Sequence, residues 1–258
     1  MRVILPILIC AFCAGIILAT DTNKDLFLAW NAAAQWLSPF LWAGITNLGN
    51  TFGAFCLLAP TLAKHPRWTA AALLTVPSAG LFTHAIKRLA DLPRPAAILP
   101  PETFHIIDST LLGRSFPSGH SVTAFAAAGI LVFCSRRRLA WLVLPVAMLV
   151  AFSRIAVGAH WPLDLFAGAA GGWATAALGC ALSARWRFWE NAHGQRILAG
   201  TVFFCALMFV FEQTGYPRGD WMQYLLCAIG LLGALYAMCR PAALRKQSSP
   251  SGQEGSKP

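Results

Sequence analysis

Two ionisable side chains in the second half of the chain could form a nucleophile and its orienting partner. His160 and Asp164 lie four residues apart in the stretch SRIAVGAHWPLD, 153–164. Residues at this spacing share a face on a helix, and Pro162 is compatible with a helix that begins at about residue 161. An aspartate bonded to one imidazole nitrogen fixes the tautomer and raises the basicity of the other. The pair therefore indicates an activated nucleophile; taken alone, it could instead be a satisfied polar pair inside a membrane.

A second stretch, PSGH at 117–120, precedes an apolar run. Pro117 suits the first turn of a helix, so Ser118 and Gly119 would lie where free backbone N–H groups and the helix dipole favour an anion. His120 would then lie in the first turn as an available proton donor. By itself this sequence is a common kind of turn, and a short motif of this length has a high false-positive rate.

Three basic residues could bind the oxygens of a phosphate. Lys87 and Arg94 are seven residues apart in KRLADLPRP, 87–95, which is about two helical turns and predicts one shared face, with Pro93 and Pro95 ending the helix. Arg154 adds a second guanidinium. A lysine point charge and planar arginine forks together suit phosphate. The alternative for Lys87 and Arg94 alone is a role as interfacial anchors that extend to the lipid headgroups.

The elements that carry these motifs are predicted to be membrane helices. Of 258 residues, 57% are hydrophobic and only 12% are charged, well below the roughly 25% of soluble domains. The apolar runs approach the ~20 residues that cross a bilayer, so we predict an all-α, polytopic transmembrane bundle. The net charge of +10 is then explained by topology rather than by nucleic-acid binding. The candidate spans are 3–20, 44–63, 68–90, 118–134, 139–158, 161–183, 197–212 and 221–239.

The segments outside these spans also carry predictions. Segment 25–42 contains Trp30, Trp36 and Trp42 and is interpreted as an interfacial helix with its tryptophans at headgroup level, or as part of a longer second span. Residues 1–20 are interpreted as an uncleaved first helix, with a signal peptide as the alternative. We predict one transmembrane catalytic domain, 1–240, with its motifs in 87–164, and a disordered cytoplasmic tail, 241–258.

The charge distribution predicts an orientation. With the N-terminus in the cytoplasm, the arginine-rich stretches 136–138 and 185–196 and the basic tail lie inside, and most acidic residues lie outside, as the positive-inside rule requires. All three motifs then lie at external span ends. The eight cysteines lie in or beside apolar runs without the spacing of a metal site, so we predict packing roles for them and neither a disulfide nor a metal.

The conjunction of the three motifs, in this order, resembles the type 2 phosphatidic acid phosphatase (PAP2) superfamily. Its signature is K-x6-R-P, then P-S-G-H, then S-R-x5-H-x3-D, and all three parts are complete here. The resemblance implies the family's six-helix core, while two apolar runs beyond residue 196 raise the possible number of spans to eight. The matching positions are Lys87, Arg94 and Pro95; Pro117, Ser118, Gly119 and His120; and Ser153, Arg154, His160 and Asp164.

The resemblance implies a role for each of these residues. His160 would attack phosphorus and form a phosphohistidine, Asp164 would orient His160, and His120 would protonate the leaving oxygen. No metal or other cofactor is implied, because the cationic side chains supply the charge stabilisation that Mg²⁺ gives other phosphoryl-transfer enzymes. The residues that would hold the phosphate are Lys87, Arg94, Ser118, Gly119 and Arg154.

The expected function is that of an inner-membrane lipid phosphatase with its active site at the periplasmic face. Undecaprenyl diphosphate, phosphatidylglycerophosphate and phosphatidate are the leading substrates. A lipid A phosphatase and an undecaprenyl-diphosphate-dependent phosphotransferase are alternatives within the class, and an anion transporter is an alternative outside it. The expected partners are the lipid phosphate and membrane lipids, without nucleic acid, and the oligomeric state is left open.

Several residues near the motifs are less directly explained. Arg88 and Arg114 could steer an anionic headgroup or could be solvated interfacial charges. His84 and His105 are interpreted as incidental. Loop 95–116 is long and either shapes the substrate entrance or connects two helices.

Overall fold

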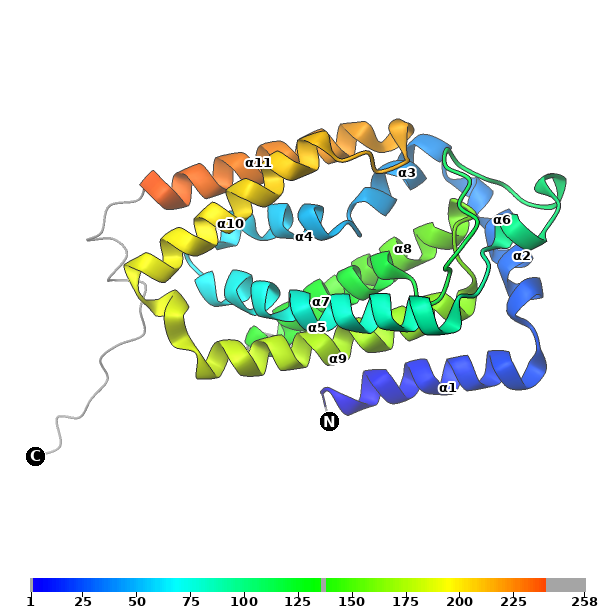
Figure 1. The fold of residues 1–258 in the computed structure, drawn as a ribbon, viewed down its shortest axis with the longest axis horizontal. Helices are drawn as coiled ribbons and strands as arrows, with labels where there is room; N and C mark the ends of the chain where they lie inside the picture. The colour runs from blue at the N-terminus through cyan, green and yellow to red at the C-terminus, as the bar shows by residue number, and fades with distance from the viewer. Residues whose placement is uncertain (1, 136–137, 240–258) are drawn as a thin grey trace, which may run out of the picture.

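The computed structural model describes residues 2–135 and 138–239 (Figure 1). Within these residues every regular element is a helix, which confirms the all-α prediction. The predicted tail, 241–258, lies outside the described residues. The α-helices are α1 (Ile4–Thr20), α2 (Asn23–Ala33), α3 (Pro39–Asn47), α4 (Thr51–Leu58), α5 (Pro66–Ala90), α6 (Pro95–Ile98), α7 (Gly119–Cys134), α8 (Val143–Ala156), α9 (Pro162–Arg185), α10 (Ala192–Phe211) and α11 (Asp220–Cys239).

Length and composition identify the helices that can cross a membrane. Four stretches qualify, namely 66–98, 162–185, 192–211 and 217–239, and the bent pair α1 and α2 gives a fifth. The apolar helices at 51–61, 119–134 and 140–156 are shorter. The chain is therefore a multi-pass membrane protein, and the choice between six and eight spans stays a prediction.

Helices α5, α7, α8 and α9 form one side of the molecule, while α10 and α11 lie together with α4 on the other (Figure 1). Small residues allow α9 to approach the start of α7. A Cβ atom at Gly168 would lie 2.6 Å from the Ser118 carbonyl oxygen, and one at Gly172 would lie 2.2 Å from that of Val122. Only glycine permits this contact, as at other membrane helix interfaces. The contact places the PSGH stretch directly against the first two turns of α9.

The predicted span 44–63 is wrong as a single helix. The structure breaks it into α3 and α4, separated by residues 48–50. The Asn50 side chain accepts hydrogen bonds from the N–H groups of Phe52 (2.8 Å) and Gly53 (3.3 Å), so it caps a new helix at this point. The apolar run continues across the break, so hydropathy alone does not predict that Asn50 begins a new helix.

The predicted interfacial segment 25–42 is confirmed only in part. Helix α2 leaves α1 at an angle of 112°, but the helical path ends at Trp36 and α3 then begins at Pro39. Trp36 is 71% exposed, whereas Trp42 is 1% exposed and packs in a core cluster with Ala156 and Tyr216. The expectation of three tryptophans at headgroup level is therefore wrong for Trp42, because α3 turns it into the protein.

Candidate active site

The three motifs meet at one end of the bundle. They are brought there by the turn after α5, the segment 99–118, and the α8–α9 turn, which Figure 1 shows at the same end of the molecule as the α10–α11 connection. Arg94 of the first motif donates from Nη1 to His160 Nε2 of the third (3.1 Å). The Ser118 N–H of the second motif donates to the Asp164 carbonyl oxygen of the third (3.1 Å). The chain thus assembles a single site from stretches about 70 residues apart.

His160 lies in the turn immediately before α9 and is 2% exposed. The predicted helix start near residue 161 is confirmed, since Trp161 is the N-cap and α9 begins at Pro162, so His160 precedes the helix. The two side chains nevertheless meet, with 3.0 Å between His160 Nδ1 and Asp164 Oδ2. Asp164 accepts a hydrogen bond from the protonated Nδ1, so Nε2 carries the free electron pair. Burial, followed by the charges of Arg94 and Arg154, lowers the pKa of His160 well below its ordinary value and keeps the ring neutral.

Asp164 is fixed by more groups than the sequence indicated. Its Oδ2 accepts hydrogen bonds from the Trp161 N–H (3.0 Å) and from the Ser115 hydroxyl. Ser115 is fully buried and also lies 3.4 Å from His160 Nδ1. These contacts hold the carboxylate in one orientation, so its bond to the imidazole is preorganised. Ser115 was missed because it precedes the recognisable PSGH stretch.

Lys87 and Arg94 reach the site by a different route from the predicted one. Helix α5 ends at Ala90, with Asp91 in a left-handed conformation, and Arg94 is the cap of α6. The prediction that Lys87 and Arg94 share a helix face is therefore wrong. Arg94 donates to the carbonyl oxygens of Gly113 (2.9 Å) and Ala159 (3.0 Å). Lys87 Nζ donates to the carbonyl oxygens of Arg114 (2.6 Å) and Ser115 (3.1 Å).

Arg154 is almost completely buried, at 2% exposure. Its Nη1 donates to the Thr46 hydroxyl and its Nη2 to the Tyr216 hydroxyl (2.9 Å). Its Nε has no hydrogen-bond partner among the described residues. A buried guanidinium with an unused donor is costly unless a ligand completes it, so Arg154 retains a donor for an anion.

The PSGH stretch leads into α7, although Pro117 precedes the N-cap rather than lying in the first turn, and its residues differ in availability. Ser118 is the N-cap and is fully buried. Its N–H is used by Asp164, so the prediction of a free Ser118 N–H is wrong. Gly119 and His120 instead line a cavity. They lie in the first helical turn, whose N–H groups have no intrahelical partner.

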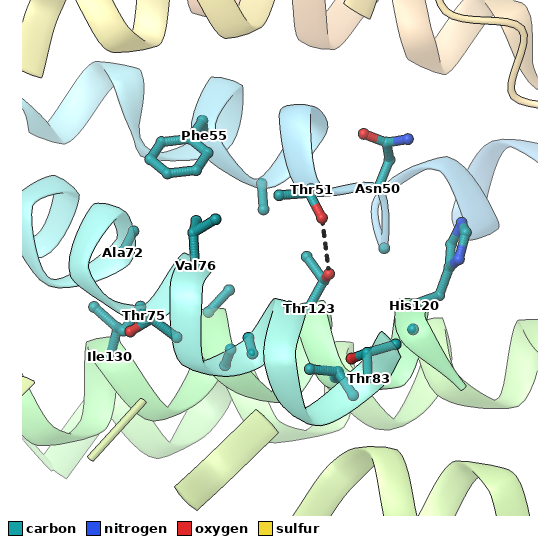
Figure 2. Close-up of a pocket in the computed structure, with 18 of the residues that line it drawn as sticks. Asn50, Thr51, Phe55, Ala72, Thr75, Val76, Thr83, His120, Thr123 and Ile130 are labelled. Atoms are coloured by element: carbon teal, nitrogen blue, oxygen red, sulfur yellow. Dashed lines mark hydrogen bonds between the residues drawn. The ribbon is translucent and has the colours of Figure 1, made fainter. Parts of the chain in front are cut away.

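The cavity lies between α4, α5 and α7 and has a volume of about 400 Å³. Lys87, His84 and His120 line one end. Figure 2 shows Phe55, Ala72 and Ile130 at the other end, with a Thr51–Thr123 hydroxyl hydrogen bond (3.3 Å) between the two. The cavity thus connects charged and titratable groups with an apolar interior, which is the pattern required by an amphipathic ligand.

The remaining predicted residues fall outside this arrangement or at its edge. Arg114 and Asp91 form an exposed ion pair at 3.6 Å, and Arg88 is exposed. His105 is exposed and uses its backbone to bind Asn31. Within the described residues no group of three or more His, Cys, Asp or Glu side chains could hold a metal ion.

Comparisons with known proteins find similarity in the region that contains the three motifs. Residues 68–190, which contain all three motifs, match the model of the PAP2 superfamily. The lipid A 1-phosphatase of Rhizobium etli is 38% identical over 117 residues, or 43% of this chain and 49% of that protein. The undecaprenyl-diphosphatase of Sulfolobus acidocaldarius is 43% identical over 54 residues, or 21% of this chain and 26% of that protein.

Two solved structures share the fold. The crystal structure of Aquifex aeolicus LpxE matches with a TM-score of 0.54 and 27% identity over 62% of this chain and 94% of that one. The PAP2-type phosphatidylglycerolphosphate phosphatase of Bacillus subtilis matches with a TM-score of 0.51 and 19% identity over 72% and 97%. Residues 68–190 of the chain therefore belong to the PAP2 superfamily. The chain's matches span half or less of the length of these curated relatives.

Proposed function

We propose that this protein is an integral membrane lipid phosphatase that hydrolyses a lipid phosphate or diphosphate through a phosphohistidine on His160. The observation that carries the proposal is the orientation of His160. Asp164 accepts from Nδ1, and Nε2 faces Arg94, a phosphate-binding side chain. An imidazole held in this way directs its electron pair at the position that a bound phosphate would occupy.

In the first step, Arg94 Nη1 breaks its hydrogen bond to His160 Nε2 and donates to a phosphate oxygen instead. Nε2 then attacks phosphorus, the bond to the lipid oxygen breaks, and His120 gives its proton to that oxygen. Lys87, Arg94, Arg154 and the N–H of Gly119 stabilise the charge on the transferred group. Ser118 contributes by capping α7 and by donating its N–H to the Asp164 carbonyl oxygen, rather than by donating that N–H to the phosphate.

In the second step, a water molecule attacks the phosphohistidine. His120, now neutral, accepts a proton from this water, and the phosphorus–nitrogen bond breaks to release inorganic phosphate and restore His160. No metal enters either step, because the side chains named above supply the charge.

The cavity supports a lipid substrate. His120 and Lys87 line the same cavity as the apolar side chains of Phe55, Val76 and Ile130. A phosphate at the charged end would place a hydrocarbon chain along the apolar end. Undecaprenyl diphosphate, phosphatidylglycerophosphate and phosphatidate remain the leading substrates.

A lipid A phosphate is the second candidate. It is favoured by the 117-residue match to a lipid A 1-phosphatase and by the likeness to LpxE. Phosphate release from a panel of these four lipids would rank them. Transfer to an added lipid acceptor without phosphate release would instead identify a phosphotransferase.

We place the site at the periplasmic face of the inner membrane. The basic stretch 185–196 joins the end of α9 to the start of α10, whereas the site lies at the start of α9, and basic connections of this kind stay in the cytoplasm. A cysteine introduced at exposed Leu112 should react with a membrane-impermeant maleimide in intact spheroplasts. Labelling only after lysis would reverse the orientation.

The decisive experiment measures phosphate release by purified protein with EDTA present. We expect wild-type activity, inhibition by vanadate, and loss of activity in His160→Ala. His193→Ala is the matched control, since His193 is exposed at the start of α10. Full activity in His160→Ala would refute the nucleophile assignment, and solute flux without phosphate release would favour a transporter.

A further inference from the structure

The α10–α11 connection, residues 212–219, reaches the candidate active site from outside the segment 68–190 that matches the family model. Tyr216 lies in this connection and is 2% exposed. Its hydroxyl accepts from Arg154 Nη2 at 2.9 Å, and Arg154 Cζ lies 5.1 Å from the centre of its ring. One side chain of the C-terminal hairpin therefore contacts a phosphate-binding arginine through both its hydroxyl and its ring.

Neighbouring contacts hold this connection in place on both sides. The Ser109 hydroxyl donates to the Gly215 carbonyl oxygen (2.5 Å), and Arg218 Nη1 pairs with Asp108 (3.1 Å). From α3, Asn47 Nδ2 donates to the Gly219 carbonyl oxygen (2.8 Å). Tyr216 is thus held between the segment that leads to PSGH and the helix that carries Thr46.

We propose that Tyr216 is a positioning residue that fixes the plane of the Arg154 guanidinium for phosphate binding, an inference that rests on the proposed function. Thr46 and Tyr216 bind one terminal nitrogen each, and the Nε of Arg154 is left without a partner. Because the two hydroxyl acceptors bind separate nitrogens, they fix the plane of the guanidinium. Its remaining N–H donors are therefore oriented for phosphate before phosphate binds.

The placement of Arg154 makes this support necessary. Its guanidinium is buried, and its hydrogen-bond partners among the described residues are neutral hydroxyls rather than a carboxylate. A carboxylate in this position would neutralise the charge that the phosphate requires. Hydroxyl groups instead satisfy the desolvated donors and leave the positive charge available.

The test compares Tyr216→Phe with Tyr224→Phe and Tyr236→Phe, since these two tyrosines are 56% and 65% exposed. We expect Tyr216→Phe to weaken vanadate binding, measured calorimetrically, and to lower kcat/KM by about tenfold, the cost of one hydrogen bond to a charged group. The two control variants should match the wild type. Thr46→Val removes the other acceptor at similar volume and should weaken vanadate binding to a similar extent.

A double-mutant cycle separates positioning from a structural role. In an Arg154→Ala background, Tyr216→Phe should cause no further loss of vanadate affinity or kcat/KM. An equal loss in both backgrounds, or wild-type vanadate binding in both Tyr216→Phe and Thr46→Val, would overturn the proposal. A wild-type protein that binds vanadate but releases no phosphate would instead contradict the proposed function and leave the Tyr216 cycle measurable.

Discussion

The two halves of the candidate site differ in exposure and in how tightly they are held. The half built on the α8–α9 turn, with Arg154, His160 and Asp164, is 2% exposed at each residue and is hydrogen-bonded on several sides. The half that faces the cavity contains Lys87 and His120, which are only partly buried. The proposed nucleophile is therefore preorganised within the protein, and the proposed proton donor lines the cavity proposed for the substrate.

This difference follows from the chemistry that each half is proposed to perform. A nucleophile gains from a fixed tautomer and a dry environment. A proton donor must meet a leaving group that arrives with each substrate, and it must then meet water. Mutations in the buried half should therefore lower kcat for every substrate. The effect of mutations in the cavity half on kcat or KM should depend on the leaving group and the lipid chain of the substrate.

The largest effect is expected for Asp164→Asn. The new side-chain amide can donate a hydrogen bond to His160 Nδ1. The imidazole proton would then lie on Nε2, which would lose its nucleophilic electron pair. We expect kcat to fall by about a thousandfold or more, as for similar substitutions in other His–Asp pairs, for lipid and soluble phosphate esters alike. The measurement is phosphate release with each substrate at saturation.

Asp91→Asn is the matched control for Asp164→Asn, because Asp91 lies at the same end of the bundle with its side chain 74% exposed. We expect its kcat to stay near that of the wild type. Retention of more than a tenth of the activity in Asp164→Asn would show that Asp164 does not set the tautomer of His160.

The next largest effect is expected for His120→Gln. Loss of a general acid lowers kcat by about a hundredfold or more when the leaving group needs a proton. A lipid alkoxide needs one, but p-nitrophenolate does not. The variant should therefore be strongly impaired on lipid phosphate and much less impaired on p-nitrophenyl phosphate.

His84→Gln provides the control for His120→Gln, since His84 lines the same cavity and is given no proton-transfer role. It should show no dependence on the leaving group. Equal losses on both substrates in His120→Gln would remove the proton-donor assignment and make His120 a binding residue.

The sequence predicts the long helices better than it predicts the groups that support the site. Helices α5 and α9 begin within two residues of their predicted starts, because long apolar runs bounded by proline leave few alternatives. The sequence does not predict the break at residues 48–50, because the mean hydropathy of the segment hardly changes at the single asparagine that caps α4. The three ordered motifs predicted residues that the structure brings together, although they did not predict the path of the chain between Lys87 and Arg94.

The supporting residues could not be predicted from spacing. Tyr216 and Thr46 are 62 and 108 residues from Arg154 in the chain. They reach it only because α3 and the α10–α11 connection pack against α8. A lone tyrosine or threonine in an apolar chain carries no local signal of such a contact, so the prediction requires the tertiary structure.

A smaller and substrate-dependent effect is expected for Val76→Trp. Val76 of α5 is one of the residues that line the cavity (Figure 2). The indole would occupy the space proposed for the lipid chain, so KM for a long-chain lipid phosphate should rise by about tenfold, roughly the loss of a few buried methylene groups. KM for p-nitrophenyl phosphate should not change.

Leu81→Trp is the matched control for Val76→Trp, because Leu81 is on the same helix, is 72% exposed and does not line the cavity. An equal rise in KM for both substrates in Val76→Trp would indicate general distortion of the site. An unchanged KM for the lipid would exclude this cavity as the path of the chain.

The smallest effect is expected for Arg114→Gln. The side chain forms an exposed ion pair with Asp91, and such pairs contribute little. The group that Arg114 offers to the site is its backbone carbonyl oxygen, which accepts from Lys87 Nζ at 2.6 Å and is retained in the variant. We therefore expect kcat/KM within about twofold of the wild type at both low and high salt, measured with an anionic lipid phosphate. A larger loss at low salt that disappears at high salt would instead assign the side chain to electrostatic steering of the substrate, and would extend the cavity-facing half of the site to the loop that precedes PSGH.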